Sequence, residues 1–190
     1  MSVLPSSHRA LHRFTVDDYH RMADAGVLGE DDRVELIEGE IVEMAPIGPL
    51  HASRVKRVAR FFHRQMGDRV IVSVQDPVRL GDLSEPQPDL ALLRPRNDDY
   101  AGAHPTADDV LLVVEVADSS VAYDRNVKMP LYAAHGIVEV WLVDLAAGIV
   151  EVWSEPGPVG YGNIRRVGAG RSLSPQAFPD VSVAVDDLLA

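Results

Sequence analysis

Apolar residues along this chain gather in short runs that predict the strands of a buried β-sheet. Residues 88–93 and 110–116 consist mostly of Leu, Val and Ala, and each run contains a single acid. Continuous apolar runs of this length are typical of strands covered on both faces. The other predicted strands are rich in β-branched residues: 70–75, which 78–80 would resume, 138–144, 149–153 and 181–185.

Two helices and a hairpin are predicted before these strands. Residues 52–66 place apolar side chains at helical spacing, with Arg and Lys between them. Residues 15–25 also predict a helix, because Thr15 can cap its first turn and Gly26 favours its end. Residues 34–44 alternate in polarity around a Glu-Gly pair, and Gly supplies the positive φ that a hairpin turn needs.

The second half of the chain predicts a βαβ unit. A helix carrying Lys128 lies between the strands at 110–116 and 138–144, so these strands should be parallel with a right-handed crossover. Pro130 should kink or split that helix near Lys128. The strand at 149–153 should then pair antiparallel with 138–144.

These elements predict an α/β (α+β) fold, with a mixed sheet flanked by helices. The 190 residues are enough for one domain, which we place at 15–190 after a loose segment at 1–14. Residues 94–109 should form a long surface connection, and the Gly- and Pro-rich stretch 155–180 should hold short strands at most.

Charge restricts the partners that the protein can bind. The net charge of −11 argues against broad, sequence-independent adhesion to nucleic acid. The stretch 51–69 is locally basic, which is compatible with phosphate contact, although a solvated helix face is the commoner explanation. No apolar run approaches the roughly 18 residues of a membrane span. Without a signal-peptide pattern or any cysteine, the expected location is the cytoplasm.

Asp89 and Glu115 carry the candidate chemistry. A carboxylate in a buried strand is costly unless it is neutralised, paired or bound to a metal. Neighbouring strands lie roughly 4.8 Å apart, so two such acids could hold Mg²⁺ or Mn²⁺, which prefer oxygen ligands. Such an ion would lower the pKa of a bound water, and Lys128 could stabilise a phosphate electrostatically.

Each of these residues also has an ordinary structural explanation. Asp89 could be an acid at the end of a loop, and Lys128 a surface residue of its helix. Glu115 could form an ion pair with Lys128 or Arg125 without any metal.

The pattern of acids resembles a known nuclease signature. Pro88-Asp89 followed by Glu115-Val116-Ala117 resembles the PD-(D/E)XK signature, whose fold is a mixed sheet flanked by helices. More of the chain, about residues 15–189, resembles the Uma-two (Uma2) family of restriction-like endonucleases. The similar blocks are 34–40 (VELIEGE), 75–80 (QDPVRL), 85–89 (EPQPD), 114–116 (VEV), 123–125 (YDR) with Lys128, 132–134 (YAA) and 139–144 (EVWLVD).

This resemblance implies a role for particular residues. It makes Asp89, Glu115 and the Val116 backbone carbonyl ligands of Mg²⁺ or Mn²⁺, with Glu35 as an accessory acid near the metal. The signature expects Lys where this chain has Ala117, and the resemblance implies that Lys128 fills that role. Alternation alone does not show which acid of the 34–38 strand faces the site.

Residues around these acids are candidates for substrate contact. They are His51, which could instead cap its helix, Gln75, Arg54 and Arg57. The leading hypothesis is a metal-dependent endonuclease that hydrolyses DNA phosphodiester bonds. The alternative, favoured by Ala117, is a catalytically inactive nuclease fold that binds nucleic acid or regulates. A third hypothesis is a homo-oligomeric structural protein, such as a homodimer, with the late hairpin as its interface.

Overall fold

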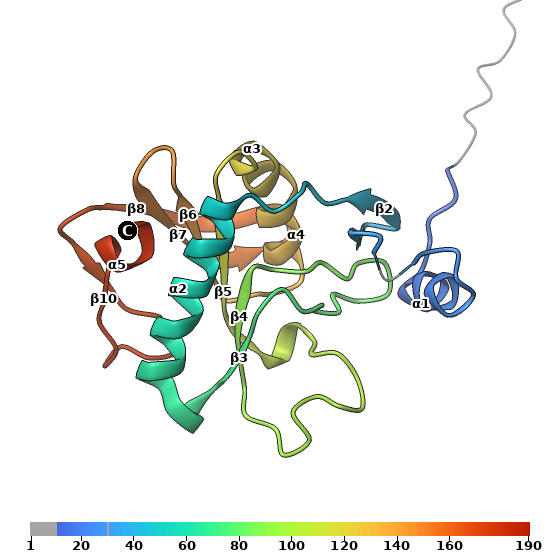
Figure 1. Cartoon of the computed structure of the whole chain (residues 1–190), viewed down its shortest axis with the longest axis horizontal. Helices are drawn as coiled ribbons and strands as arrows, with labels where there is room; N and C mark the ends of the chain where they lie inside the picture. Colours follow the sequence, from blue (N-terminus) through green and yellow to red (C-terminus); the bar gives the residue numbers. More distant parts are fainter. Residues whose placement is uncertain (1–10, 30) are drawn as a thin grey trace, which may run out of the picture.

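The computed structural model describes residues 11–29 and 31–190, in which a six-stranded mixed sheet carries helices on both faces (Figure 1). Strands β5 and β6 are parallel, and the other neighbouring pairs of this sheet are antiparallel. The predicted mixed α/β sheet is therefore confirmed, as is the parallel pairing of the βαβ unit. In spatial order the strands are β3 (Ile71–Ser73), β4 (Leu90–Leu93), β5 (Val110–Ala117), β6 (Glu139–Asp144), β7 (Ile149–Gly157) and β8 (Gly160–Gly168).

Alternating residues of β5 face two separate hydrophobic clusters. Val114 and Val116 pack in the cluster that contains the apolar face of α2 (Pro49–Met66), whereas Val113 packs in the cluster on the opposite face. Since side chains alternate along a strand, Glu115 lies on the same face as Val113. That face is covered by α4 (Met129–Ala134), so Glu115 points toward the helical segment that carries Lys128.

Helix α2 begins three residues before the predicted start. Gly48 is its N-cap and Pro49 occupies its first turn, where a fixed φ and a missing N–H favour helix initiation. The apolar spacing that predicted this helix begins only at Ala52, so it does not include the first turn. The buried residues of α2 are those that the helical spacing indicated: Val55, Val58, Ala59, Phe62 and Met66.

The helical segment after β5 changes its winding at Lys128. It comprises α3 (Val121–Tyr123), a π-helical turn η3 (Asp124–Lys128) and α4. The Met129 N–H bonds to the Asp124 carbonyl, five residues back, and Pro130 has no N–H to continue the ordinary ladder. The predicted split near Lys128 is therefore confirmed, and its form is a π turn.

Three predictions for the strands were wrong in detail. Strand β8 is nine residues long, although 155–180 was expected to hold short strands at most. It is a largely exposed edge strand, so it lacks an apolar pattern, and its backbone pairing with β7 holds it in place. Residues 78–80 make only isolated bridges. Residues 181–185 contain only a short strand, β10 (Val183–Ala184), which pairs with β9 (Ser172–Leu173) and leads directly into α5 (Val185–Leu189).

A small hairpin and α1 (Val16–Asp24) lie beside the main sheet (Figure 1). The hairpin joins β1 (Val34–Ile37) to β2 (Glu40–Glu43), and both turn residues, Glu38 and Gly39, have positive φ, as a type I′ turn requires. Thr15 and Asp18 form a capping box at the start of α1. The predicted helix and hairpin are both confirmed.

The N-terminal boundary is described only in part. Residues 1–10 of the predicted loose segment lie outside the described residues, and the division into one domain at 15–190 stays a prediction. Among residues 11–14, the Phe14 N–H donates to the Gly39 carbonyl over 3.0 Å.

Within 11–29 and 31–190, none of the helices has the length and apolar character that crossing a membrane requires. The short remaining elements are the 3₁₀ turns η1 (Gly67–Arg69) and η2 (Ala107–Asp109).

Candidate active site

The ends of β4 and β5 bring Asp89 and Glu115 together. Leu90 pairs with Val114 across the antiparallel ladder, so one further step of the register sets Asp89 opposite Glu115. The Asp89 N–H donates to Glu115 Oε2 over 3.2 Å, and the Val116 N–H donates to Asp89 Oδ2 over 2.9 Å. The two acids singled out by the sequence pattern therefore meet at one end of the sheet.

Lys128 reaches this pair from the π turn. Its Nζ lies 3.2 Å from Glu115 Oε1 and 3.6 Å from Glu35 Oε2, and the residue is 8% exposed. Tyr132, one helical turn later, donates its hydroxyl to the same Glu115 oxygen over 2.6 Å. The ammonium group of Lys128 is thus held between two buried carboxylates. It comes from the helical segment, because the strand position where the signature expects a lysine is occupied by Ala117.

Glu35 is the acid of the hairpin that faces the site. It is buried, and its Oε2 accepts a hydrogen bond of 3.2 Å from the Gln87 N–H. The Tyr123 hydroxyl donates to its Oε1 over 3.3 Å. Glu38, by contrast, is exposed at the turn. The ambiguity that alternation left open is resolved by the packing of the hairpin against the segment that precedes β4.

His51 and Gln75 both contact Asp89. His51 Nε2 and Gln75 Nε2 lie 2.9 Å and 3.1 Å from Asp89 Oδ1. His51 belongs to the first turn of α2, and Gln75 follows β3 with a φ of +57°. The hydrogen bond with Asp89 raises the pKa of the His51 imidazole, and a backbone hydrogen bond with Val116 adds to this. These two side chains orient the Asp89 carboxylate.

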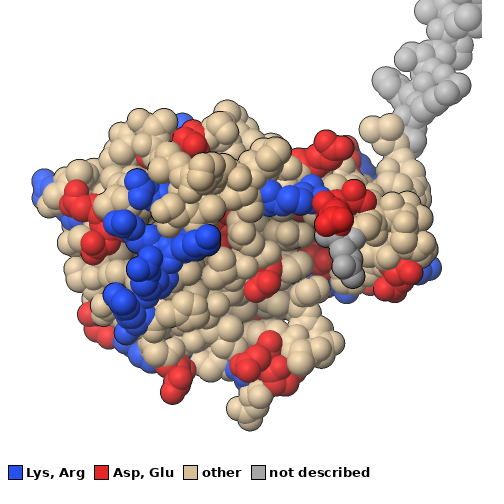
Figure 2. All heavy atoms as spheres, in the orientation of Figure 1, with Lys and Arg blue, Asp and Glu red and all other residues tan. Residues whose placement is uncertain are grey.

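Arg54 and Arg57 do not contact the acids. Arg54 donates through Nη1 to the Ala190 carbonyl, so it joins α2 to the C-terminal segment. Arg57 lines a separate cavity of about 380 Å³ with two further arginines of α2, Arg60 and Arg64. Figure 2 shows these cationic side chains gathered in a strip over α2. The structure thus separates a basic surface from an acidic pocket, and α2 spans both.

The acids open into a pocket of about 530 Å³. The hairpin, the start of α2 and the loop between β5 and α3 form its walls. Among the residues that line it are all three of Asp89, Glu115 and Lys128, together with Glu35, His51, Gln75, Tyr123 and Asp124.

The pocket has an excess of negative charge. Six carboxylates line it, against two cationic side chains, Arg33 and Lys128. Lys128 faces the buried acids as an ammonium: burial lowers its pKa, but Glu115 and Glu35 outweigh this and hold the pKa above its usual range. Burial raises the pKa of the Glu115 carboxyl, an effect that Lys128 only partly offsets and Asp89 increases. A site that disfavours its own charges in this way is suited to bind a cation.

The donor atoms fit a hard divalent cation. Asp89, Glu115 and Glu35 offer carboxylate oxygens, and Mg²⁺ and Mn²⁺ prefer oxygen ligands that include one or two carboxylates. Partial opening to solvent would let water or a phosphate oxygen complete the coordination shell.

Sequence reasoning missed Tyr132, Tyr123 and Asp124 as members of the site. Asp124 is buried and accepts a hydrogen bond of 2.7 Å from Ser120 Oγ. Tyr132 follows Lys128 by four residues, a spacing that places two helical side chains on one face. That spacing was the available signal for Tyr132.

The fold and the pocket define a protein of the restriction-endonuclease-like class. The chain belongs to the Uma2 family, described as "Putative restriction endonuclease", whose family model matches residues 16–186. The resemblance stated from the sequence is therefore confirmed.

A solved structure supports the fold assignment independently. The crystal structure of a protein from Anabaena variabilis ATCC 29413, described as a putative nuclease belonging to DUF820, is similar with a TM-score of 0.73. The alignment covers 93% of this chain and 97% of that chain at 17% identity, so the likeness concerns the fold alone. Among curated proteins, none matches this chain.

Proposed function

We propose that this protein is a metal-dependent endonuclease that hydrolyses DNA phosphodiester bonds. The observation that carries the proposal is the convergence of Asp89, Glu115 and Lys128 in one pocket. Membership of a restriction-endonuclease family supports a nuclease activity, and the basic strip of α2 supports DNA as the substrate.

Asp89, Glu115 and the Val116 carbonyl would hold Mg²⁺ or Mn²⁺, with Glu35 beside them. When bound, such an ion lowers the pKa of a coordinated water and neutralises charge that develops on the phosphate. His51 and Gln75 keep the Asp89 carboxylate turned toward the pocket. A direct carboxylate ligand that is oriented by neighbouring hydrogen bonds is a recurrent arrangement in metal sites.

Lys128 would act on the attacking water and the phosphate oxygens. Glu35 and Glu115 fix its ammonium group, and their coulombic attraction outweighs burial and holds the pKa of Lys128 above its usual range. Water attacks phosphorus, a P–O ester bond breaks, and the leaving oxygen takes up a proton. A preorganised cation at this position stabilises the extra negative charge of the transition state.

Exposed arginines of α2 would contact the DNA backbone. Arg57, Arg60 and Arg64 lie on the outer face of the helix whose first turn carries His51. Phosphate contacts of this kind position a duplex without reading its sequence. They also explain how a chain of net charge −11 could bind DNA, because the cations are concentrated on one surface.

Plasmid cleavage in Mg²⁺ or Mn²⁺ tests the proposal. We expect wild type to nick or linearise the plasmid, and Asp89→Ala and Lys128→Met to lose on the order of 100-fold or more in rate. Asp68→Ala, at an exposed acid outside the pocket, is the matched control and should retain full activity. Failure of wild type to cleave DNA, or equal cleavage by Asp89→Ala, would contradict the proposal.

Ala117 favours one other function. A fold without the strand lysine could bind DNA or metal as a regulator without turnover. In that case, wild type would retard DNA on a gel and bind the cation but leave the plasmid intact. The cytoplasmic location and the homodimer stay predictions.

A further inference from the structure

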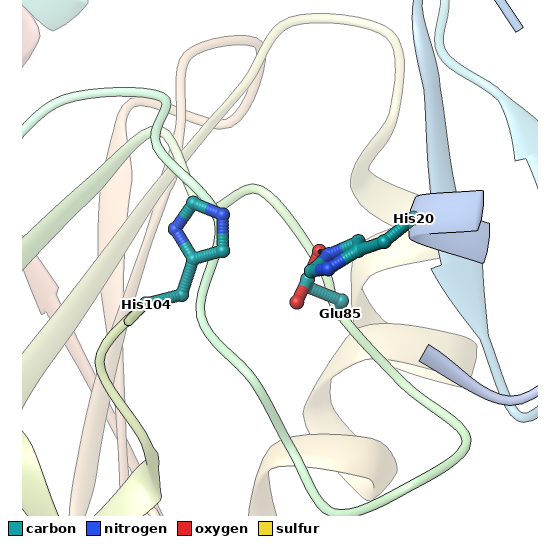
Figure 3. A group of neighbouring side chains, drawn as sticks. All are labelled: His20, Glu85 and His104. Atoms are coloured by element: carbon teal, nitrogen blue, oxygen red, sulfur yellow. Dashed lines mark hydrogen bonds and ion pairs between the residues drawn. The ribbon is translucent and has the colours of Figure 1, made fainter. Parts of the chain in front are cut away.

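Two histidines and a glutamate meet outside the acidic pocket. His20 comes from α1, Glu85 from the segment before β4, and His104 from the connection between β4 and β5 (Figure 3). His20 Nε2 lies 2.7 Å from Glu85 Oε1. One ligand atom of each residue lies within 4.8 Å of the others. Three segments far apart in sequence thus bring two imidazoles and one carboxylate to a single point.

Glu85 has an unused ligand position. The residue is 2% exposed, and its Oε2 is buried without a hydrogen-bond partner in the described part of the chain. Leaving a buried acceptor oxygen without a partner destabilises the folded state, because the oxygen has lost its contact with water. The His20 contact satisfies only the other oxygen. A buried acceptor of this kind beside two imidazoles is a suitable ligand for a cation.

We propose that His20, Glu85 and His104 bind a transition-metal cation, with Zn²⁺ as the leading candidate. Two imidazoles and one carboxylate are a common ligand set for Zn²⁺ and leave a fourth position for water. Mg²⁺ avoids such nitrogen ligands, so this site differs in chemistry from the carboxylate pocket. It therefore goes beyond the proposed nuclease activity and does not depend on it.

The required rearrangement is small. Zn²⁺ lies roughly 2.0–2.2 Å from its ligands, which sets tetrahedral ligand atoms roughly 3.4 Å apart. The present spread of up to 4.8 Å therefore requires at most roughly 1.4 Å of closure, which a rotation of the exposed His104 side chain can supply. His20 and Glu85 would exchange their direct hydrogen bond for bonds to the metal.

The metal would tie α1 and the 94–109 connection to the segment that leads into the active site. The Glu85 N–H donates to the Leu36 carbonyl over 2.7 Å, and two residues later the Gln87 N–H binds Glu35. Asp89 follows directly on this segment. Metal at Glu85 would therefore brace the backbone that positions Glu35 and Asp89, without contacting the substrate.

Metal stoichiometry of untagged protein tests the site. After chelator treatment, wild type should bind Zn²⁺ at about one per chain and should show visible absorption when Co²⁺ replaces it. His104→Asn should weaken Zn²⁺ binding by on the order of 100-fold, because loss of a residue that only hydrogen-bonds to a metal ligand already costs about 10- to 100-fold. His104 is exposed, so this variant should fold, which circular dichroism can verify.

Two controls identify the site that is measured. His63→Asn removes an exposed histidine of α2 and should leave Zn²⁺ binding unchanged. Asp89→Asn alters the acidic pocket and should also leave it unchanged. Equal Zn²⁺ affinity in His104→Asn and wild type would overturn the proposal, and so would loss of Zn²⁺ in Asp89→Asn. Neither result depends on whether the protein cleaves DNA.

Discussion

Mg²⁺ should stabilise this protein against unfolding, because its acidic pocket lacks sufficient positive charge. Glu35 and Glu115 both contact Lys128 Nζ, at 3.6 Å and 3.2 Å, so the two carboxylates lie close to one another as well. At an effective dielectric of about 20, two unit charges within about 7 Å repel by about 2 kcal/mol or more. Asp89 and Asp124 add further negative charge, and a bound dication would relieve this repulsion.

The size of the effect follows from linkage. A ligand that binds only the folded state stabilises it by about 2.7 kcal/mol at 100 times its dissociation constant. For a chain of 190 residues, each kcal/mol raises the melting temperature by roughly 2–4 °C. Saturating Mg²⁺ should therefore raise the melting temperature by about 5–10 °C relative to chelator-treated protein.

Thermal unfolding followed by circular dichroism measures this shift. Each Mg²⁺ titration is compared with NaCl at equal ionic strength, which removes the general screening effect. Mg²⁺ is preferred to Zn²⁺ because it should not bind the His20–Glu85–His104 cluster. Asp89→Asn preserves the size of the side chain but removes a charged ligand, so its shift should fall to near zero, whereas Asp68→Asn should behave as wild type.

Two outcomes would refute this reasoning. The first is no Mg²⁺-dependent rise in the melting temperature of wild type. The second is an equal rise in Asp89→Asn, because the cation would then act elsewhere on the acidic surface.

Three further predictions concern single contacts. Tyr132→Phe removes the 2.6 Å hydrogen bond to Glu115 without changing the shape of the core, and it should cost about 1.5–3 kcal/mol in urea-induced unfolding; a smaller loss would mean that this bond is weak. Glu151→Gln should cost about 1–3 kcal/mol at neutral pH, because Arg125 and Arg166 lose their charged partner, although Arg125 keeps Asp144 and is partly exposed to solvent. Burial alone would raise the pKa of Glu151, but hydrogen bonds with arginine hold it below its usual range. The stability that this contact gives the wild type should therefore be complete above pH 4.5 and lost as the pH falls through the lowered pKa. The free energy of unfolding of Glu151→Gln should accordingly fall less steeply with decreasing pH than that of the wild type. Arg60→Gln should reduce the slope of log affinity against log salt for DNA by about 1, and an unchanged slope would place the DNA elsewhere.

The main sheet was predictable because its strands carry strong local signals. Asp89 and Glu115 stand out as single acids in apolar runs, and the antiparallel register then places them opposite one another. Strand β8 was not predictable in this way. Its side chains are mostly exposed, so backbone pairing with β7 decides its length, and no alternation of apolar residues records that pairing.

The side-chain environment of the site depends on contacts that no local pattern encodes. Glu35 faces the pocket because the hairpin packs on the segment at 85–87, which a strand alternation cannot show. Arg54 belongs to the basic strip by sequence, yet it binds the Ala190 carbonyl at the far end of the chain. Both outcomes are decided by tertiary contacts over more than 50 residues.

Two buried glutamates of this sheet show why the acidic pocket differs from an ordinary ion pair. Glu151 is fully buried, and both Arg125 and Arg166 bind its carboxylate. Arg125 also binds the buried Asp144, so two arginines serve two acids. Glu115 is equally buried but shares the single ammonium of Lys128 with Glu35. Because Arg125 is committed to Glu151, it is not available to neutralise Glu115. The same chain thus gives one buried acid, Glu151, enough cationic partners and leaves another, Glu115, with too little positive charge in an open pocket. A shortage of positive charge beside Glu115 is expected if an external cation completes the site. A purely structural acid would instead gain stability from the kind of pairing that Glu151 has.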